Sequence, residues 1–257
     1  VQNKNNNLPL KNLELHKIAY VNMGDADATP FVNSLKKYTK VEVVNATNLD
    51  ALIASLSNYN TVIVGFHKSN VNPWKSYEFT DKELVWLYEI ARTNNVILTL
   101  FAKPYALNDF NTFENFESIL MAYQNSPIAQ QKAAQIIFGA LPAKGSLPVS
   151  CGIDFKVGEG LQTNSLNRLT YGLPESVGMD ARRLKKIDSI AKFAISEQMT
   201  PGIQLLVARK GKVIYEKSFG YHTYKKSSEV KFNTLYDVAS LTKILATLPL
   251  LMELVDS

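Results

Sequence analysis

Short apolar runs alternate with longer amphipathic stretches through the first half of the chain. The apolar runs are rich in β-branched residues and fall at 16–23, 41–46, 61–66, 96–101 and 117–123. The stretches with apolar residues at helical spacing fall at 28–39, 48–59, 81–95 and 127–139. Continuous apolar strands predict burial on both faces, and strands that alternate with helices predict a parallel sheet. The pattern therefore predicts an α/β sandwich with a mainly parallel sheet. Asp81 can cap the third helix, and Gly139 can end the fourth.

Periodicity disappears in the middle of the chain. Glycines, asparagines and other turn formers accumulate over residues 152–173. This composition is typical of a connecting segment. We therefore predict a first domain over residues 1–151, a linker over 152–173 and a second domain over 174–257.

The second domain combines helical and strand-like patterns. Apolar residues at helical spacing predict a helix over residues 180–198. Two strand-like runs then flank a turn that contains Gly211, which predicts a hairpin over residues 203–221. A strongly apolar stretch at residues 244–254 predicts one further helix. The second domain is thus expected to be a partial α+β segment.

Composition excludes several classes of function. A hydrophobic content of 46% with 20% charged residues is ordinary for a folded domain. The net charge of +5 comes from scattered lysines, so we expect no nucleic-acid partner. No apolar run reaches the roughly 18 residues of a membrane helix, so we predict no transmembrane segment.

Cysteine and histidine usage predicts no metal site and no other cofactor. Cys151 is the single cysteine, so no intramolecular disulfide can form. The three histidines, His16, His67 and His222, lie far apart and lack the spacing of metal ligands. We expect packing roles for all four side chains.

The end of the first half contains an ordered set of motif residues. They are Phe138, Gly139, Pro142, Gly145, Leu147 and Pro148. This block resembles the close of the C-terminal α/β-sandwich domain of glycoside hydrolase family 3, and the resemblance extends over residues 10–151. In that family the substrate sits mainly in a separate barrel that supplies an aspartate nucleophile. The resemblance implies that a carbohydrate or peptidoglycan-derived substrate would be bound through such a barrel, which is missing from this sequence.

One loop offers a weak candidate for glycosidase chemistry. Retaining glycosidases need two carboxyl groups roughly 5 Å apart, one as nucleophile and one as acid/base. Some family 3 members are known to bring the acid/base from a loop of the C-terminal domain, and the loop at residues 67–83 contains Glu78 beside Trp74 and Tyr77. The alternative, a solvated glutamate in a long loop, stays open, because loop carboxylates are usually exposed.

The sharpest chemical signal is a serine three residues before a lysine. The S-x-x-K spacing occurs at Ser34/Lys37, Ser189/Lys192, Ser228/Lys231 and Ser240/Lys243. Only the last pair follows the predicted hairpin and opens a strongly apolar helix. Residues three apart share a helix face, so the lysine nitrogen can lie beside the serine oxygen and act as its base. Ser240 is the candidate nucleophile, although serine is also a favoured helix cap.

The surrounding sequence carries a second resemblance. Its residues are Thr200, Pro201, Gly202, Phe219, Gly220, Tyr236, Asp237, Ala239, Ser240, Thr242 and Lys243. Together they resemble the class C β-lactamase, esterase and D-alanyl-D-alanine peptidase group, with Ser240 and Lys243 as the catalytic pair. That group also needs a Tyr-x-Asn or Ser-x-Asn element and a Lys-Thr-Gly-like strand, and neither follows Lys243. We therefore expect a truncated second domain that is prone to self-association.

Joined in one chain, the two resemblances are typical of large exported hydrolases. They imply a fragment of a bifunctional enzyme, a β-N-acetylhexosaminidase-like glycosidase followed by a β-lactamase-like domain. Such an enzyme would act on cell-wall glycans in the periplasm or another extracytoplasmic compartment, and the fragment alone would be inactive.

Two other hypotheses remain. A non-catalytic carbohydrate-binding or partner-docking α/β module would bind its ligand near the loops that start at Met23, His67 and Ala102. A complete small serine esterase would need the downstream motifs that this sequence lacks.

Overall fold

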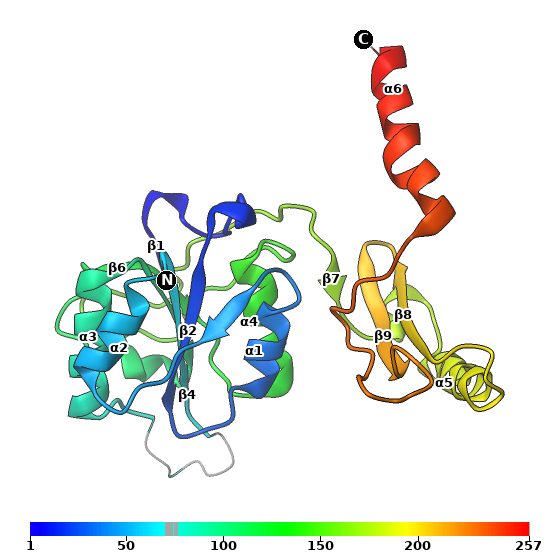
Figure 1. Cartoon of the computed structure of the whole chain (residues 1–257). Helices are drawn as coiled ribbons and strands as arrows, with labels where there is room; N and C mark the ends of the chain where they lie inside the picture. The colour runs from blue at the N-terminus through cyan, green and yellow to red at the C-terminus, as the bar shows by residue number, and fades with distance from the viewer. Residues whose placement is uncertain (70–73, 75–76, 257) are drawn as a thin grey trace. The chain divides into compact units, whose positions relative to one another are not determined.

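The computed structural model describes residues 1–69, 74 and 77–256 (Figure 1). The chain divides into two compact units, Val1–Thr170 and Tyr171–Ser257. The division falls after residue 170, within the linker predicted over residues 152–173.

The first unit is built on a six-stranded sheet with the order β1-β6-β5-β4-β2-β3. The strands are β1 (Gln2–Asn3), β2 (Ile18–Gly24), β3 (Val41–Val43), β4 (Thr61–His67), β5 (Val96–Phe101) and β6 (Phe116–Met121). All neighbours pair in parallel except β1, which runs antiparallel to β6 at the edge. The mainly parallel sheet predicted from the apolar runs is confirmed.

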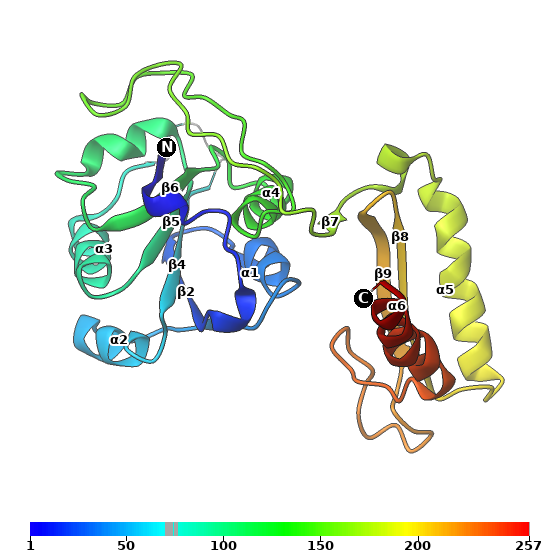
Figure 2. The same ribbon diagram turned by 90° about the horizontal axis from the view of Figure 1, so that it is seen from above.

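Helices cover both faces of this sheet. They are α1 (Thr29–Leu35), α2 (Leu49–Leu56), α3 (Asp81–Thr93) and α4 (Pro127–Ile137). α1 and α4 contact each other on one face, and α2 and α3 contact each other on the other (Figure 2). One core cluster contains Phe31, Phe101 and Phe138, and the opposite cluster contains Phe66 and Leu87, all fully buried. Each such side chain contributes on the order of 1.5–3 kcal/mol, so both faces stabilise the sheet.

Local hydrogen bonds set the helix ends. Thr80 caps α3: its hydroxyl accepts from the backbone N–H of Glu83 at 3.2 Å, and the Glu83 carboxylate accepts from the Thr80 N–H at 2.8 Å. Asp81, the predicted cap, lies instead in the first turn, where its charge still suits the helix dipole. α4 ends at Ile137, and Gly139 follows with the left-handed φ of 68° expected of a helix-ending glycine.

A buried polar network ties the carboxyl end of β4 to the start of α4. The Asn125 side-chain oxygen lies 2.7 Å from His67 Nδ1 and accepts from Gln130 Nε2 at 2.9 Å. Because that oxygen can only accept, His67 carries its proton on Nδ1. The His67 Nε2 atom lies 2.9 Å from the Tyr20 hydroxyl, which also donates to the Asn22 side-chain oxygen at 3.1 Å. Burial, the main cause, lowers the pKa of His67 to about 4. A Cβ at Gly65 would lie 2.5 Å from His67 Nε2, so this strand position needs a glycine.

The turn-rich segment after Cys151 packs on the first unit. The Arg168 guanidinium donates to the carbonyls of Leu10 and Phe138, at 2.7 Å each. Backbone hydrogen bonds also join residues 158–163 to the loop at 143–147. Most of the predicted linker, residues 152–169, is therefore part of the first unit. Its contacts combine backbone groups, Arg168 and single apolar side chains such as Phe155, which is buried in the core and packs on Phe113. Isolated contacts of this kind leave no apolar periodicity in the sequence.

The second unit contains a three-stranded sheet with the order β7-β9-β8. Its elements are β7 (Thr170–Tyr171), α5 (Ala181–Ser196), β8 (Gly202–Arg209) and β9 (Lys212–Gly220). β8 and β9 form the predicted hairpin, and α5 forms the predicted helix. Val177, Leu184, Ile214 and Tyr215 make up the small buried cluster.

The last part of the chain is helical but irregular. It comprises a 3₁₀ turn at Ala239–Leu241, a π-helical turn at Lys243–Thr247 and α6 (Leu248–Asp256). The sequence predicts one regular helix here. Pro249 has no N–H to donate to the Leu245 carbonyl, which explains the departure from α-helical bonding before it. None of the described side chains of these three elements is buried.

Across residues 1–69, 74 and 77–256, no helix combines the length and apolar character that a membrane span requires.

We expect the first unit to lose stability as the pH falls through the window between the two pKa values of His67. Its pKa is 6.5 in the unfolded chain and about 4 in the fold. Between these values the unfolded chain binds a proton that the folded chain does not, so acid favours unfolding. The full cost is about 3 kcal/mol, because each pKa unit corresponds to about 1.4 kcal/mol.

Urea unfolding followed by tryptophan fluorescence measures this loss, since both tryptophans, Trp74 and Trp86, lie in the first unit. The His67→Gln variant should show a shallower fall in unfolding free energy between pH 7 and pH 4. The exposed His222→Gln control should keep the parent slope. An unchanged slope in His67→Gln contradicts the prediction.

Candidate functional site

The structure brings the two predicted catalytic side chains together. Lys243 Nζ donates a hydrogen bond of 3.1 Å to Ser240 Oγ. Ser240 lies in the 3₁₀ turn, and Lys243 begins the π-helical turn that follows. The three-residue spacing places both side chains on one side of the helical stretch. This distance is within the reach required between a nucleophile and its base.

The backbone that leads into Ser240 is a tight turn. The Asp237 carboxylate accepts from the Ala239 N–H at 2.8 Å, and the Val238 carbonyl accepts from the Leu241 N–H at 2.8 Å. Ala239 has a φ of 42°, in the left-handed region that residues other than glycine rarely adopt. Strained backbone next to a reactive group is frequent at functional sites. Both of these hydrogen bonds, between Asp237 and Ala239 and between Val238 and Leu241, are short-range.

The pair is exposed on the surface of the second unit. Both side chains face solvent, and neighbouring Leu241 and Ile244 are 56% and 60% exposed. In the part of the chain that the structure describes, no further side chain hydrogen-bonds to Ser240 Oγ or Lys243 Nζ. The arrangement therefore pairs a hydroxyl group with an amine on the surface of the second unit.

The other S-x-x-K sites occupy ordinary helix or loop positions. Ser34 is buried within α1, and Ser189 lies in the middle of α5. Ser228 is in the exposed loop after β9. Only the Ser240 site joins a strained turn to an exposed helical stretch.

Glu78 is exposed and precedes the cap of α3. Within the same loop, residues 70–73 and 75–76 lie outside the described residues. Asp109 is a neighbouring carboxyl group that sequence reasoning missed: burial, and secondarily the charge of Glu78, raise its pKa. Its carboxylate accepts from the Phe79 N–H at 2.8 Å, which ties it to the backbone. Asp109 follows β5 within a short 3₁₀ helix, and no motif in the sequence distinguishes it.

A polar hollow of about 770 Å³ lies at the carboxyl end of the parallel sheet. It is lined by Ala26, Asp27, Ser69, Lys103, Pro104, Tyr123, Gln124, Asn125 and Ser126. These residues come from the loops after β2, β4, β5 and β6. The loops named from the sequence, which start at Met23, His67 and Ala102, thus contribute to one hollow. Asn125 joins it to the buried His67 network, which orients the carboxamide.

The cysteine and the histidines occupy separate places. The buried Cys151 thiol donates to the Pro104 carbonyl at 3.3 Å, and burial raises its pKa. His67 stacks on Phe101 with ring centroids 4.4 Å apart, and His16 hydrogen-bonds to the Thr61 hydroxyl. No group of three metal-ligating side chains gathers among the residues described.

The sequence pattern of the Beta-lactamase family matches residues 187–257. Two putative D-alanyl-D-alanine carboxypeptidases, from Salmonella enteritidis and Salmonella gallinarum, are each 33% identical over 94 residues. The match covers 34% of this chain and 22% of each relative. The aligned part of the chain thus spans less than a quarter of the length of these curated relatives.

Solved structures of glycosidases match at low identity. A β-glucosidase from Listeria innocua in complex with isofagomine has a TM-score of 0.46 and 17% identity, covering 58% of this chain and 25% of its own. A family 3 exo-β-xylosidase in complex with a xylobiose aziridine probe has a TM-score of 0.49 and 11% identity, covering 68% and 32%. The chain thus contains a β-lactamase-like segment, residues 187–257, in which Ser240 and Lys243 lie.

Proposed function

We propose that Ser240 is the nucleophile of a serine acyl-transfer site of the β-lactamase and D-alanyl-D-alanine peptidase type. The observation that supports the proposal is the 3.1 Å hydrogen bond between Lys243 Nζ and Ser240 Oγ. It lies inside the stretch that matches the β-lactamase family. The strained turn at Ala239 adds a backbone feature frequent at reactive residues.

The chemistry follows from the two groups. Ser240 Oγ forms a bond to the carbonyl carbon of an amide or β-lactam, and its proton passes to the Lys243 amine. The C–N bond then breaks, and the leaving nitrogen takes a proton. Water attacks the resulting ester, which releases the acid and restores the serine hydroxyl.

The first unit would be the accessory domain of a β-N-acetylhexosaminidase-like glycosidase. Its support is the ordered motif from Phe138 to Pro148 in the loop after α4. The parent protein would then be an exported bifunctional hydrolase that acts on cell-wall glycans outside the cytoplasm. The curated relatives are named as D-alanyl-D-alanine carboxypeptidases, and a cell-wall substrate for the parent protein agrees with those names. The sugar itself would bind mainly in a barrel outside this sequence.

This chain alone would be inactive. A retaining glycosidase needs two carboxyl groups roughly 5 Å apart, and the sequence offers only exposed Glu78 as a candidate. Loss of one oxyanion donor costs about a hundredfold to a thousandfold in rate. Ser240 lies exposed, and among the described residues no strand faces it.

We expect a fluorophosphonate probe to modify Ser240 faster than the other serines. The lysine amine removes the hydroxyl proton, and this assistance is worth about a hundredfold or more in well-formed sites. Peptide mass spectrometry after timed labelling measures the rate at each serine. Lys243→Ala should slow labelling of Ser240 by at least about tenfold.

The matched control is the pair at Ser228 and Lys231, which has the same spacing in an exposed loop. Lys231→Ala should leave labelling of Ser240 unchanged. Equal labelling of Ser240 and Ser228 would remove the support for the proposal. A chromogenic cephalosporin should show no turnover above that of Ser240→Ala, and turnover that this variant abolishes contradicts the inactivity of the chain.

We also propose that the second unit associates with a second copy through its helical end. Leu248, Leu251 and Leu254 on α6 are 47%, 54% and 73% exposed, and an apolar helix surface in water favours association. Light scattering after size exclusion should give a mass above that of the monomer and rising with concentration. Leu251→Glu with Leu254→Glu should restore the monomer. A parent chain that is monomeric at all concentrations rules out this association.

A second candidate function is ligand binding by the first unit without catalysis. The polar hollow at the carboxyl end of the sheet favours it, because ligands of α/β folds bind there. The charged and amide groups of Asp27, Lys103 and Asn125 suit the hydroxyl groups of a sugar.

Calorimetric titration with an N-acetylglucosamine trisaccharide tests the second function. We expect weak binding that Gln124→Trp abolishes by filling the hollow, since Gln124 lines it and is exposed. Gln131→Trp, on the exposed side of α4, is the control and should bind as the parent does. Binding that survives Gln124→Trp, or no binding by the parent, argues against a saccharide site here.

A further inference from the structure

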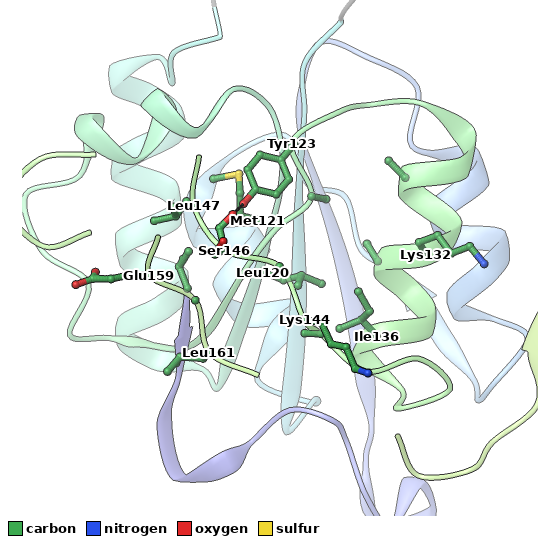
Figure 3. Close-up of a pocket in the computed structure, with 17 residues that line it drawn as sticks. Leu120, Met121, Tyr123, Lys132, Ile136, Lys144, Ser146, Leu147, Glu159 and Leu161 are labelled. Atoms are coloured by element: carbon green, nitrogen blue, oxygen red, sulfur yellow. Dashed lines mark hydrogen bonds between the residues drawn. The ribbon is translucent and has the colours of Figure 1, made fainter. Parts of the chain in front are cut away.

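A smaller cavity, of about 270 Å³, opens between β6, α4 and the loop that follows α4 (Figure 3). Protein interiors are normally packed about as densely as organic crystals. Here small residues leave the space open: Ala122, Ala129, Ala133, Ala143, Gly145 and Gly160. The cavity shares only Tyr123 with the polar hollow at the sheet end.

The remaining walls are mainly apolar and are tied in place. Leu120 on β6, Ile136 on α4 and Leu147 in the loop present their side chains to the cavity (Figure 3). The Leu147 N–H donates to the Glu159 carbonyl at 2.7 Å, and the Tyr123 hydroxyl donates to the Ser146 carbonyl at 3.0 Å. These bonds join both sides of the opening to the domain. The cavity is therefore formed before any ligand enters, as in most small-molecule sites.

The residues that line the cavity include two lysines and one glutamate. Lys132 comes from α4 and Lys144 from the loop, and Glu159 is the one carboxylate among the lining residues. The charged ends of Lys132 and Glu159 point away from the cavity, so Lys144 is the charged group that a ligand would meet (Figure 3). The Glu159 carboxylate accepts from the Lys156 N–H at 2.8 Å. A ligand that is mostly apolar and carries one negative charge therefore complements this site.

We propose that this cavity binds the hydrocarbon part of a small carboxylic acid, with the carboxylate beside Lys144. A cavity of about 150 Å³ holds benzene, so this one holds a ligand of about ten non-hydrogen atoms. Octanoate has this size and charge. The site uses neither Ser240 nor the hollow at the sheet end, so it stands independently of the proposed functions.

Calorimetric titration of the full chain with octanoate tests the proposal. A ligand of this size in a partly open apolar site should bind with a Kd of about 0.1–1 mM. Ala129→Trp, which fills the cavity from α4, should weaken binding at least tenfold. Ile128→Trp is the matched control, because Ile128 is exposed on the same helix and does not line the cavity. It should bind octanoate as the parent does.

Titration with octanol, which has the same hydrocarbon chain but no charge, separates the contribution of the ligand's carboxylate from that of its apolar part. Lys144→Gln should raise the Kd of octanoate about threefold and leave that of octanol unchanged, because a partly exposed ion pair is worth little more. If Ala129→Trp does not fold, Ser146→Trp at the exposed rim replaces it. If the parent chain does not bind octanoate, the proposal is wrong. It is also wrong if octanoate binding survives in both cavity variants, Ala129→Trp and Ser146→Trp.

Discussion

Burial of a parallel sheet on both faces is the constraint on which the first unit depends. Every residue of β4 and β5 is buried, because α1 and α4 cover one face and α2 and α3 cover the other. Polar groups are therefore concentrated where strands end. At the end of β4, His67 joins Tyr20 and Asn125 in a network kept neutral by burial. The same geometry brings four loops to one polar hollow.

The second unit has an antiparallel β8–β9 pair, for which burial on both faces is not required. α5 covers its three-stranded sheet with a small buried cluster, and α6 has no buried side chain among its described residues. The contact between Ser240 and Lys243 still forms, because it needs only one helical turn. The proposed acyl-transfer activity would require a further protein surface that excludes water and supplies the second oxyanion donor.

The segment at 152–169 has the composition of a linker but belongs to the first unit. Its turn-rich sequence is typical of a linker, yet its backbone hydrogen bonds and Arg168 attach it to the first unit. Glu159 and Leu161 in this segment complete the apolar cavity beside α4. The boundary between the units and the proposed acid-binding cavity both follow from this attachment.

The sequence by itself determined the five parallel strands, the hairpin, the helices α1 to α5 and the Ser240–Lys243 contact, whereas the short strands β1 and β7 left no pattern in it. The features that it determined depend on periodicities of two and about 3.6 residues and on a spacing of three, which are local properties of the chain. It did not determine the Thr80 cap of α3, the π-helical turn before Pro249 or the position of the unit boundary. Only the tertiary structure decided that His67 meets Asn125 and that Arg168 reaches Leu10. Residues so far apart in sequence meet only after the sheet has formed, and no local pattern records that contact.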